Sequence, residues 1–456
     1  MLIELHNVDI GYDDNYLLRN VNLQIETGHC HCISGATGCG KSSLLQLLAG
    51  TFEHSYQGQV KVKPNCIVGL VCQDPNVQII RQTIGAEVAF ALENLAVPLV
   101  EMQQQVRHSL QLVGLDLALN TPISHLSLGQ KYRLMIAAQL VCHPSVLLLD
   151  EPWAQLDDQG VTELLGLLSG LLQRNIAVVI VEHNYQAFSS LITHAWHIDQ
   201  AQLFCGDYLV KQSKGVARQR PCYQDSAAIY IETAAFELGF ESSILFACQQ
   251  PLTLQAGQVI AVVGSNGCGK TSLLKLLAGF DPQVKKLSVQ VLQKLPELGV
   301  YGANLGFLTQ RPSRQLFETT VLKELQFSLS RFDLPLSYAS NILIELDLVA
   351  LSELSPHKLS YGQQHLIALA CLACINPKVL LLDDPFAGLD DYYSNKVIKL
   401  IERLVQQGCG VIFSSHRDDD MNLADTVWRI EQGLLTVESQ SFTSANDWDH
   451  GYDDIA

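Results

Sequence analysis

Two glycine-rich segments contain the residue types that bind phosphate groups. They read GATGCGKS at residues 35–42 and GSNGCGKT at residues 264–271. Glycines let backbone N–H groups curl around phosphate oxygens, and the N-terminus of a following helix adds positive potential. We expect both lysines to reach the β- and γ-phosphates of a bound triphosphate, and the hydroxyls of Ser42 and Thr271 to ligate Mg²⁺. The candidate binding residues are Gly35, Gly38, Gly40, Lys41, Ser42, Ser43, Gly264, Gly267, Gly269, Lys270, Thr271 and Ser272.

Four carboxylates in two pairs are the candidate metal ligands and catalytic groups. Asp150 and Asp383 each end an apolar run that predicts a buried parallel strand, and ligands of α/β proteins bind at the carboxyl ends of such strands. We expect both aspartates to hold the magnesium shell. Glu151 and Asp384 follow them, where a carboxylate can polarise the attacking water. The alternative interpretation is an ordinary acid at the end of a strand.

The elements that position these residues occur twice. Apolar runs at residues 31–34 and 259–263 predict strands before the glycine segments, and helical spacing of leucines predicts a helix after each. LSLGQ at residues 126–130 matches LSYGQ at residues 359–363. The offset is 229 residues for the glycine segments (264 − 35) and 233 for the later motifs (360 − 127). The chain is therefore predicted to be a tandem of two homologous α/β units.

The glycine loop, the Leu-Ser-x-Gly-Gln signature, the Asp-Glu-Pro run at residues 150–152 and a lone downstream histidine together resemble the ATP-binding cassette (ABC) ATPases. The resemblance implies two P-loop NTPase domains, each with a mainly parallel sheet, an antiparallel β part and a helical subdomain. It also implies that the domains close face to face over two ATP molecules, each held between one P-loop and the other domain's signature. The predicted boundaries are residues 1–210 for domain 1, 211–225 for a linker, 226–439 for domain 2 and 440–456 for an acidic tail.

The same resemblance assigns roles to single positions. Gln73 and Gln310 are similar to the glutamine that senses Mg²⁺ and the transport partner, and His183 and His416 to the switch histidine that contacts the γ-phosphate. Segments 154–157 and 387–390 resemble the loops that join the two ATP sites. The signature residues expected to bind the nucleotide are Ser127, Gly129, Gln130, Ser360, Gly362 and Gln363. Tyr12 and Phe240 resemble the aromatic residue that stacks on adenine, although each is equally consistent with packing.

The two halves depart from the family pattern in ways that bear on catalysis. Leu128 and Tyr361 occupy the third signature position, where the family has glycine. Asp384 is one methylene shorter than Glu151, and a misplacement of about 1 Å can cost roughly a hundredfold in rate. We therefore hypothesise that the two ATP sites are unequal, the faster one using Glu151.

Several cysteines lie where reactivity or metal binding must be weighed. Cys39 and Cys268 lie inside the glycine loops, where a helix N-terminus can lower a thiol pKa, but a small packing residue is the favoured interpretation. Residues 30–32 read Cys-His-Cys and residues 371–374 read Cys-Leu-Ala-Cys. Neither has a second ligand pair at zinc-like spacing, so we predict core packing for both.

Composition limits the biological role. The chain has 456 residues, 29 basic against 46 acidic, a net charge of −17 and a mean hydropathy of +0.16. No apolar run approaches the ~18 residues of a membrane-spanning helix, and the N-terminus has no basic region of a secretory signal. We expect a cytoplasmic protein. The acidity opposes diffuse attraction to nucleic acid.

Two classes of tandem ATPase remain: a subunit of a membrane importer, and a soluble ATPase acting on ribosomes or DNA. The short linker and the acidity favour the importer. Residues 73–95 resemble the energy-coupling factor (ECF) type, which feeds vitamin and metal-ion uptake, and sugar importers with fused cassettes are the competing type. The expected partners are a polytopic permease and a small substrate-binding membrane protein, with the chain peripheral on the inner face of the cell membrane. The apolar residues that either line a groove for a permease helix or belong to the core are Val77, Ile79, Ile80, Leu316 and Phe317.

Overall fold

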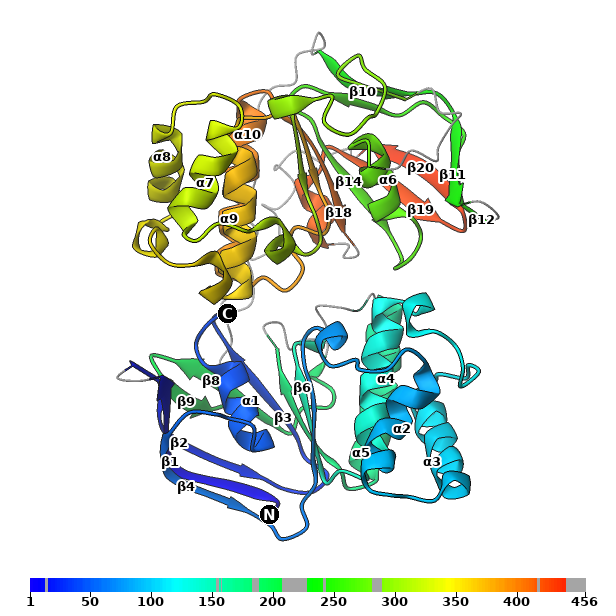
Figure 1. Ribbon diagram of the computed structural model, residues 1–456, viewed down its shortest axis with the longest axis vertical. Helices are drawn as coiled ribbons and strands as arrows, with labels where there is room; N and C mark the ends of the chain where they lie inside the picture. The colour runs from blue at the N-terminus through cyan, green and yellow to red at the C-terminus, as the bar shows by residue number, and fades with distance from the viewer. Residues whose placement is uncertain are drawn as a thin grey trace, which may run out of the picture. The chain divides into compact units, whose positions relative to one another are not determined.

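A computed structural model gives the fold of the chain (Figure 1). It describes residues 1–12, 15–152, 156, 158–182, 188–206, 228–240, 243–280, 289–415 and 419–439. The chain divides into two compact units, one made mostly of the first half and the other mostly of the second half. The predicted linker and acidic tail lie outside the described residues.

The first half is built around a mainly parallel sheet of order β5-β6-β7-β3-β8-β9. All neighbours are parallel except the final pair, β8 and β9. The inner strands β6 and β7 are continuous runs of buried Val, Leu, Ile and Ala, apart from the half-buried aspartate that ends β6, as expected where both faces of a sheet are covered. The strands are β5 (Val68–Val71), β6 (Val146–Asp150), β7 (Ala177–Val181), β3 (Cys30–Gly35), β8 (His194–Asp199) and β9 (Gln202–Cys205).

A second, antiparallel sheet of the first half has the order β2-β1-β4. Its strands are β1 (Ile3–Tyr12), β2 (Asn15–Ile25) and β4 (Tyr56–Val62). Alternate residues of β1, such as Ile3, Leu5, Val8 and Ile10, are buried with only the register shifts that bulges introduce. They share a core with α1 (Lys41–Ala49), which follows the first glycine loop.

The remaining helices of the first half pack around a separate apolar core, drawn beside the sheets in Figure 1. They are α2 (Ile84–Asn94), α3 (Leu99–Leu112), α4 (Leu128–Leu140) and α5 (Asp158–Gln173). Buried residues of α2 and α3 recur at helical spacing, Ile84, Val88 and Leu92 in one and Val106 and Leu110 in the other. This core also includes residues of β3, β5, β6 and β7, so the predicted helical part packs against the main sheet.

The second half repeats this design with a larger mixed sheet of order β11-β12-β20-β19-β14-β18-β17-β16. Its central strands are parallel, and β11/β12 and β19/β20 are antiparallel. A small antiparallel sheet has the order β13-β10-β15. The strands are β10 (Ile229–Thr233), β11 (Phe236–Phe240), β12 (Ser243–Cys248), β13 (Thr253–Gln255), β14 (Val259–Gly264), β15 (Val289–Val291), β16 (Leu305–Leu308), β17 (Val379–Leu382), β18 (Gly410–Ser415), β19 (Thr426–Glu431) and β20 (Leu434–Ser439).

The helices of the second half follow the order of the first. They are α6 (Lys270–Leu277), α7 (Val321–Ser330), α8 (Ser337–Glu345), α9 (Tyr361–Ala373) and α10 (Asp391–Gln406). The predicted α/β class, with a mainly parallel sheet, an antiparallel part and a helical part in each half, is confirmed. Among the described residues, every helix is too short or too polar to cross a membrane.

Candidate nucleotide sites

Both glycine loops lie between the predicted strand and helix. The first connects β3 to α1, and the second connects β14 to α6. The Lys41 ammonium donates hydrogen bonds to the carbonyl oxygens of Gly35 at 2.8 Å and of the next residue at 3.0 Å. Lys270 makes the same bonds, to Gly264 at 2.6 Å and to the next residue at 3.0 Å. Each loop therefore wraps around its own lysine, which places the positive charge inside the loop.

Glycine is required at the start of each loop by close backbone contacts. A Cβ atom on Gly35 would lie 2.9 Å from the carbonyl oxygen of Ile198, and one on Gly264 would lie 2.5 Å from that of Ile430. Both residues also have φ near +154°, which side chains rarely adopt. The other glycines of the motifs have φ between 82° and 111°: Gly38, Gly40, Gly267 and Gly269.

The two loop cysteines are packing residues, as predicted. Burial raises the pKa of the Cys39 and Cys268 thiols, and the neighbouring lysines lower it by less. The other two cysteine motifs are also confirmed as core: Cys30 and Cys32 are buried in β3, and burial raises the pKa of Cys30 and of Cys374 to about 12. Such thiols stay protonated at neutral pH, so they are poor nucleophiles and poor metal ligands.

The two aspartates that follow the buried strands lie at the predicted edge of the sheet. In the second half, the aspartate accepts a hydrogen bond from the threonine hydroxyl of the glycine motif. Asp383 is 3 % exposed, and its Oδ1 accepts hydrogen bonds from Thr271 Oγ1 and Ser414 Oγ, both at 2.9 Å. Burial raises the Asp383 pKa, and these two hydroxyls oppose the rise. Asp150 ends β6 and is half-buried, whereas Ser42 is exposed at the start of α1. A carboxylate beside a hydroxyl is the oxygen donor set that Mg²⁺ prefers, so the residues fit that ion.

The candidate catalytic acids share an unusual backbone conformation. Glu151 has φ 45° and Asp384 has φ 54°, both in the left-handed region that costs most side chains free energy. In both halves, this strained backbone conformation places the carboxylate just beyond the end of the strand. Gln73 Nε2 donates a hydrogen bond to Glu151 Oε2 at 2.5 Å, so these two predicted residues are brought together.

A second pair of glutamines, which the sequence reading missed, holds the loops that carry Gln73 and Gln310. Gln78 accepts a hydrogen bond from the Cys72 N–H at 2.8 Å and donates one to the Leu70 carbonyl at 3.0 Å. Gln315 does the same in the second half, with the Thr309 N–H at 3.0 Å and the Phe307 carbonyl at 2.9 Å. Gln310 itself is exposed. We call each loop closed in this way a glutamine clasp.

Two buried glutamates anchor the chain after each clasp. Glu87 is 4 % exposed and accepts hydrogen bonds from the N–H groups of Ile80 and Arg81, at 3.0 and 2.6 Å. Glu324, 2 % exposed, accepts from Phe317 and Glu318, at 2.9 and 2.7 Å. The signal was present in the sequence, because Gln78 and Gln315, like Glu87 and Glu324, are separated by 237 residues, the same offset as Gln73 and Gln310 (310 − 73).

The signatures form helix N-termini. Ser127 Oγ accepts from the Gln130 N–H at 3.2 Å, and the Gln130 side chain accepts from the Ser127 N–H at 2.9 Å. Ser360 and Gln363 make the same reciprocal pair, at 3.4 and 3.0 Å. This capping box explains the serine and the glutamine locally, since it satisfies two backbone donors at the start of α4 and α9. The free N–H groups of these helix ends are suited to an anion.

Packing also explains the signature glycines. A Cβ atom on Gly129 would lie 3.1 Å from Leu156, and one on Gly362 would lie 2.9 Å from the ring of Tyr393. Burial raises the pKa of the Tyr393 phenol. The glycines therefore let a neighbouring side chain cover each helix end closely, a structural role beside the predicted contact with phosphate.

Several predicted site residues fall outside the described part of the chain. His183 and His416 are among the residues that the structure does not describe, as are most of segment 154–157 and the side chains of Tyr12 and Phe240. Their roles stay predictions. Of the remaining loop residues, Ser43 is buried and Ser272 is half-buried beside the lysines of the motif.

The apolar residues near the clasps divide between surface and core. Val77, Ile80 and Phe317 are 74 %, 65 % and 59 % exposed. Leu316 is only 4 % exposed, and Ile79 packs against the helical core of the first half. Three of the five residues thus lie on the surface, immediately after the loops that carry Gln73 and Gln310.

Relatives and solved structures agree with this geometry. A Methanosarcina mazei protein with the provisional name of ABC transporter ATP-binding protein is 27 % identical over 96 % of this chain and 95 % of its own. A Bacillus subtilis protein provisionally named HMP/thiamine import ATP-binding protein YkoD is 26 % identical over 93 % of this chain and 88 % of its own. The archaeal ribosome recycling factor aABCE1, solved with ribosomal stalk protein aP1, matches with a TM-score of 0.62 and 17 % identity over 94 % and 89 % of the chains, which shows the fold.

The family model described as ABC transporter matches twice, over residues 18–154 and 249–387. Each match begins before a glycine loop and ends beyond a strand-end aspartate, so each includes the glycine loop, the clasped loop, the signature and the carboxylate pair of its half. Both halves therefore bind ATP and have the machinery of an ATPase. The chain belongs to the ABC transporter family and carries two ABC ATPase domains in tandem.

Proposed function

We propose that this chain is the energy-coupling ATPase of an ECF-type importer for a vitamin or a metal ion. Its partners are a polytopic membrane permease and a small substrate-binding membrane protein, and it works peripherally on the inner face of the cell membrane. The YkoD relative is named as an import ATP-binding protein, and its similarity extends over most of both chains, which supports this proposal. The segment after Gln73, which resembles the ECF type, supports it independently.

The ATPase chemistry is assigned to matched residues of the domains spanning 1–210 and 226–439. Lys41 and Lys270 neutralise the β- and γ-phosphates from inside their loops, since their ammonium groups already lie there. Bound Mg²⁺ would supply charge stabilisation between the phosphates. Asp383 with Thr271, and Asp150 with Ser42, would hold that ion, a role that the 2.9 Å bond in the second half supports.

Water activation is assigned to Glu151 and Asp384. Each carboxylate, lifted past its strand end by a left-handed backbone, orients a water toward the γ-phosphate. Gln73, bonded to Glu151, links the position of that carboxylate to the clasped loop. His183 and His416 are assigned to the γ-phosphate. The signatures beginning at Ser127 and Ser360 bind the nucleotide of the opposite domain in a head-to-tail pair.

The observation that carries the importer role is the exposed apolar surface beside each glutamine clasp. Val77 lies inside the first clasped loop, and Ile80 and Phe317 are held through their own N–H groups by the two buried glutamates. Exposed apolar side chains on a firmly held backbone are suited to an amphipathic helix of a partner. We assign this surface to a cytoplasmic helix of the permease, because movement of Gln73 with the nucleotide would then be transmitted to that helix.

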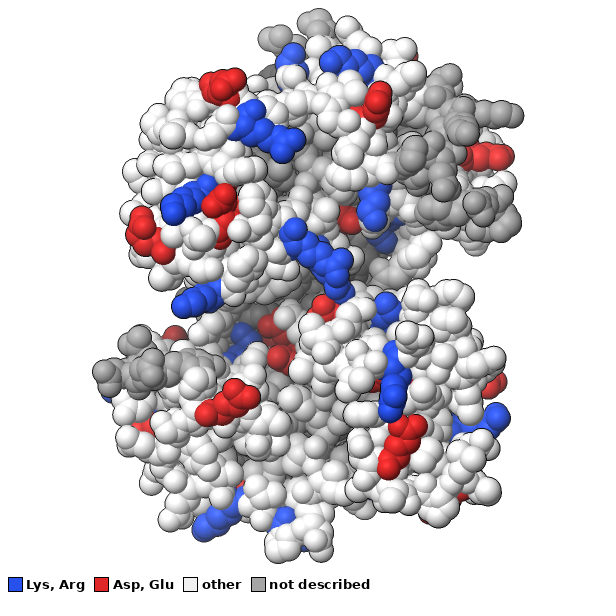
Figure 2. Space-filling view, viewed as in Figure 1, with Lys and Arg blue, Asp and Glu red and all other residues white. Residues whose placement is uncertain are grey.

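Charge favours a membrane partner over nucleic acid. On the face that Figure 2 shows, the Lys and Arg side chains of the described residues are interspersed with Asp and Glu and do not gather into one basic surface. The net charge of −17 adds to this argument, because binding to the backbone phosphates of nucleic acid depends on clustered basic residues.

Crosslinking in native membranes tests the proposal. A photoreactive amino acid at Val77 or Phe317, in the full chain expressed in its own host, should capture a polytopic membrane protein. The same probe at Val100 is the control, because this residue is 83 % exposed but lies on α3. Mass spectrometry identifies the captured chains. Capture of ribosomal proteins instead, with no membrane protein, would overturn the importer role in favour of a soluble ATPase.

A matched pair of variants separates docking from ATP binding. Ile80→Asp and Phe317→Asp should each release the chain from membrane fractions and leave ATP binding unchanged, because neither side chain touches a glycine loop. Val100→Asp should release none. Membrane association that survives both substitutions contradicts the assigned surface.

A further inference from the structure

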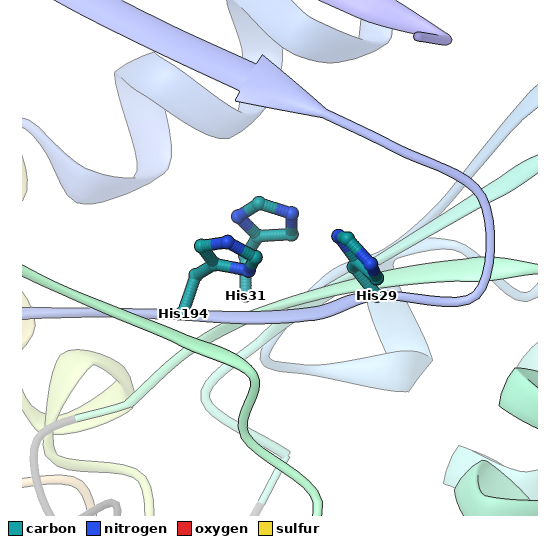
Figure 3. A group of neighbouring side chains, drawn as sticks. All are labelled: His29, His31 and His194. Atoms are coloured by element: carbon teal, nitrogen blue, oxygen red, sulfur yellow. The ribbon is translucent and has the colours of Figure 1, made fainter.

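Three histidines meet at the end of β3 that is farthest from the glycine loop. His31 and His194 are direct partners in the parallel pairing of β3 with β8, and His29 immediately precedes β3. One ring nitrogen of each histidine lies within 4.8 Å of those of the other two. Figure 3 shows the three rings gathered on one side of the strands. The glycine loop begins at Gly35, about 13 Å away along the strand at ~3.3 Å per residue.

A neighbouring hydroxyl orients the His194 ring as a ligand. The Thr193 hydroxyl donates to the Cys30 carbonyl at 2.9 Å, so at 3.0 Å from His194 Nδ1 it acts as an acceptor. His194 therefore carries its proton on Nδ1 and a free electron pair on Nε2. Metal-binding histidines are usually oriented by such contacts on the second nitrogen. His29 Nδ1 lies 3.7 Å from the Glu26 carboxylate, beyond hydrogen-bond distance, and has no hydrogen-bond partner among the described residues.

The third ring is buried with a polar atom that has no partner. His31 is 1 % exposed, and its Nε2 makes no hydrogen bond. Its Nδ1 accepts from the Trp196 indole N–H at 3.2 Å. Burial, followed by the two neighbouring histidines, lowers the pKa of His31 to about 3, so the ring is neutral. Because Nδ1 accepts this bond, the neutral ring carries its proton on Nε2, where the buried N–H has no acceptor in the described part of the chain. The electron pair that an ion would use is therefore the one on Nδ1, which now faces the Trp196 indole.

The second half shows that the fold does not need these histidines. The pairing of Ile260 with Thr426 is equivalent to that of His31 with His194, and Gln258 occupies the position of His29. There the Gln258 amide donates to Thr426 Oγ1 at 3.2 Å. A glutamine, an isoleucine and a threonine thus complete the same corner without titratable groups.

The site has an entrance. A cavity of about 380 Å³ is lined by His29, His194, Trp196, Glu26 and Cys205, among others. His29 and His194 are half-buried at its wall, so an ion can reach them from solvent. The space also leaves room for water ligands.

We propose that His29, His31 and His194 bind a divalent transition metal ion of the class Zn²⁺, Ni²⁺, Co²⁺ or Cu²⁺. Imidazole ligands select these ions over Mg²⁺ and Ca²⁺, and three protein ligands leave a position for water from the cavity. The His31 and His194 rings are stacked, with centroids 4.7 Å apart and planes at 11°. Binding therefore turns the half-buried His194 about its Cβ–Cγ bond, and His31 exchanges the Trp196 contact for the ion. The site is independent of the ATPase sites and of the importer role.

The site is tested by titrating the untagged, nucleotide-free full chain with Ni²⁺ and measuring the binding by isothermal titration calorimetry. The decisive variant is His29→Gln with His194→Thr, which copies the second half and so preserves packing. We expect it to bind Ni²⁺ about 100-fold more weakly than the unaltered chain. His108→Gln is the matched control, because His108 is exposed on α3, and its affinity should not change. Equal Ni²⁺ affinity of the double variant and the unaltered chain would overturn the proposal.

Tryptophan fluorescence gives a second readout that a structural role would not produce. Ni²⁺ bound beside Trp196 should quench the emission of this residue. Because the chain has 4 tryptophans, only part of the total emission should fall, and Trp196→Phe should abolish this Ni²⁺-dependent quenching. Quenching that is identical in Trp196→Phe places the ion elsewhere and rejects the site. Unchanged ATP binding by the double variant shows that it is folded.

Discussion

The two halves of the chain build the same clasped loops but differ around their candidate catalytic carboxylates. Gln78 and Gln315 close their loops through matching bonds, and Lys41 and Lys270 lie in matching glycine loops. The difference lies in the neighbouring strand, which is β18 in the second half and β7 in the first. Ser414 bonds both Asp383 and the Asp384 N–H in the second half, whereas its counterpart in the first half is Val181, which has no hydroxyl.

This difference indicates separate constraints on binding and on hydrolysis. The groups that hold phosphate and fix the loops are the same in kind, so both sites should bind ATP. The groups around the attacking water differ. The Glu151 N–H bonds the Val181 carbonyl at 2.9 Å, and the Glu151 side chain bonds Gln73. The Asp384 carboxylate is one methylene shorter, so its reach toward the water is less.

The largest expected effect comes from replacing the two carboxylates one at a time. Glu151→Gln should lower steady-state ATP turnover by about a hundredfold or more, because it removes the full-length base. Asp384→Asn should leave most of the turnover. ATP hydrolysis by the purified chain in Mg²⁺ measures both. A comparable loss from the two substitutions would refute the inequality of the sites.

The next effect should be equal in the two halves. Gly35→Ala and Gly264→Ala each force a Cβ atom against a backbone carbonyl at a φ that alanine avoids. A strain of about 1–3 kcal/mol in the loop should weaken ATP binding at that site by roughly 10- to 100-fold. Each variant leaves the other ATP site intact. The affinity of a fluorescent ATP analogue for each variant then compares the effect of the substitution in the two halves. Gly166→Ala is the control, because nothing lies within 4 Å of a Cβ atom there.

A smaller effect is expected from the buried glutamates. Glu87→Ala and Glu324→Ala each leave two backbone N–H groups without their acceptor, at a cost of about 1–2 kcal/mol in unfolding free energy. Because each glutamate holds the backbone of an exposed apolar residue of the proposed docking surface, membrane association should fall before ATP binding does. Chemical denaturation and membrane sedimentation measure the two quantities. Loss of ATP binding without loss of membrane association would assign these glutamates to the nucleotide site.

Much of the fold followed from local patterns. The glycine loops, the strands before them and the strands ending at Asp150 and at Leu382 were predicted correctly, because motif geometry and apolar runs are local properties. The capping boxes at Ser127 and Ser360 are local as well. The helical part and the antiparallel part were predicted only through the family resemblance.

Long-range pairing explains what the sequence reading missed. His31 was read with its sequence neighbours Cys30 and Cys32, whereas its structural neighbour is His194, 163 residues away (194 − 31), brought in by strand register. No structural role was predicted for Glu87 or Glu324. Their roles depend on which N–H groups the preceding loop turns toward them, and spacing alone does not specify this.

The smallest effect concerns pH and Asp383. Burial raises the pKa of this carboxyl above its ordinary value, so folding disfavours its ionised form. Its stabilising contribution is complete below the unfolded pKa and is lost as pH rises through the folded pKa. Asp383→Asn should therefore stabilise the nucleotide-free chain at neutral pH, and the gain should disappear in acid. Thermal unfolding at several pH values measures this. Asp150→Asn should gain less, because Asp150 is only half-buried. A larger gain for Asp150→Asn would mean that the hydroxyls around Asp383, which oppose the effect of burial, dominate the difference between the two strand-end aspartates.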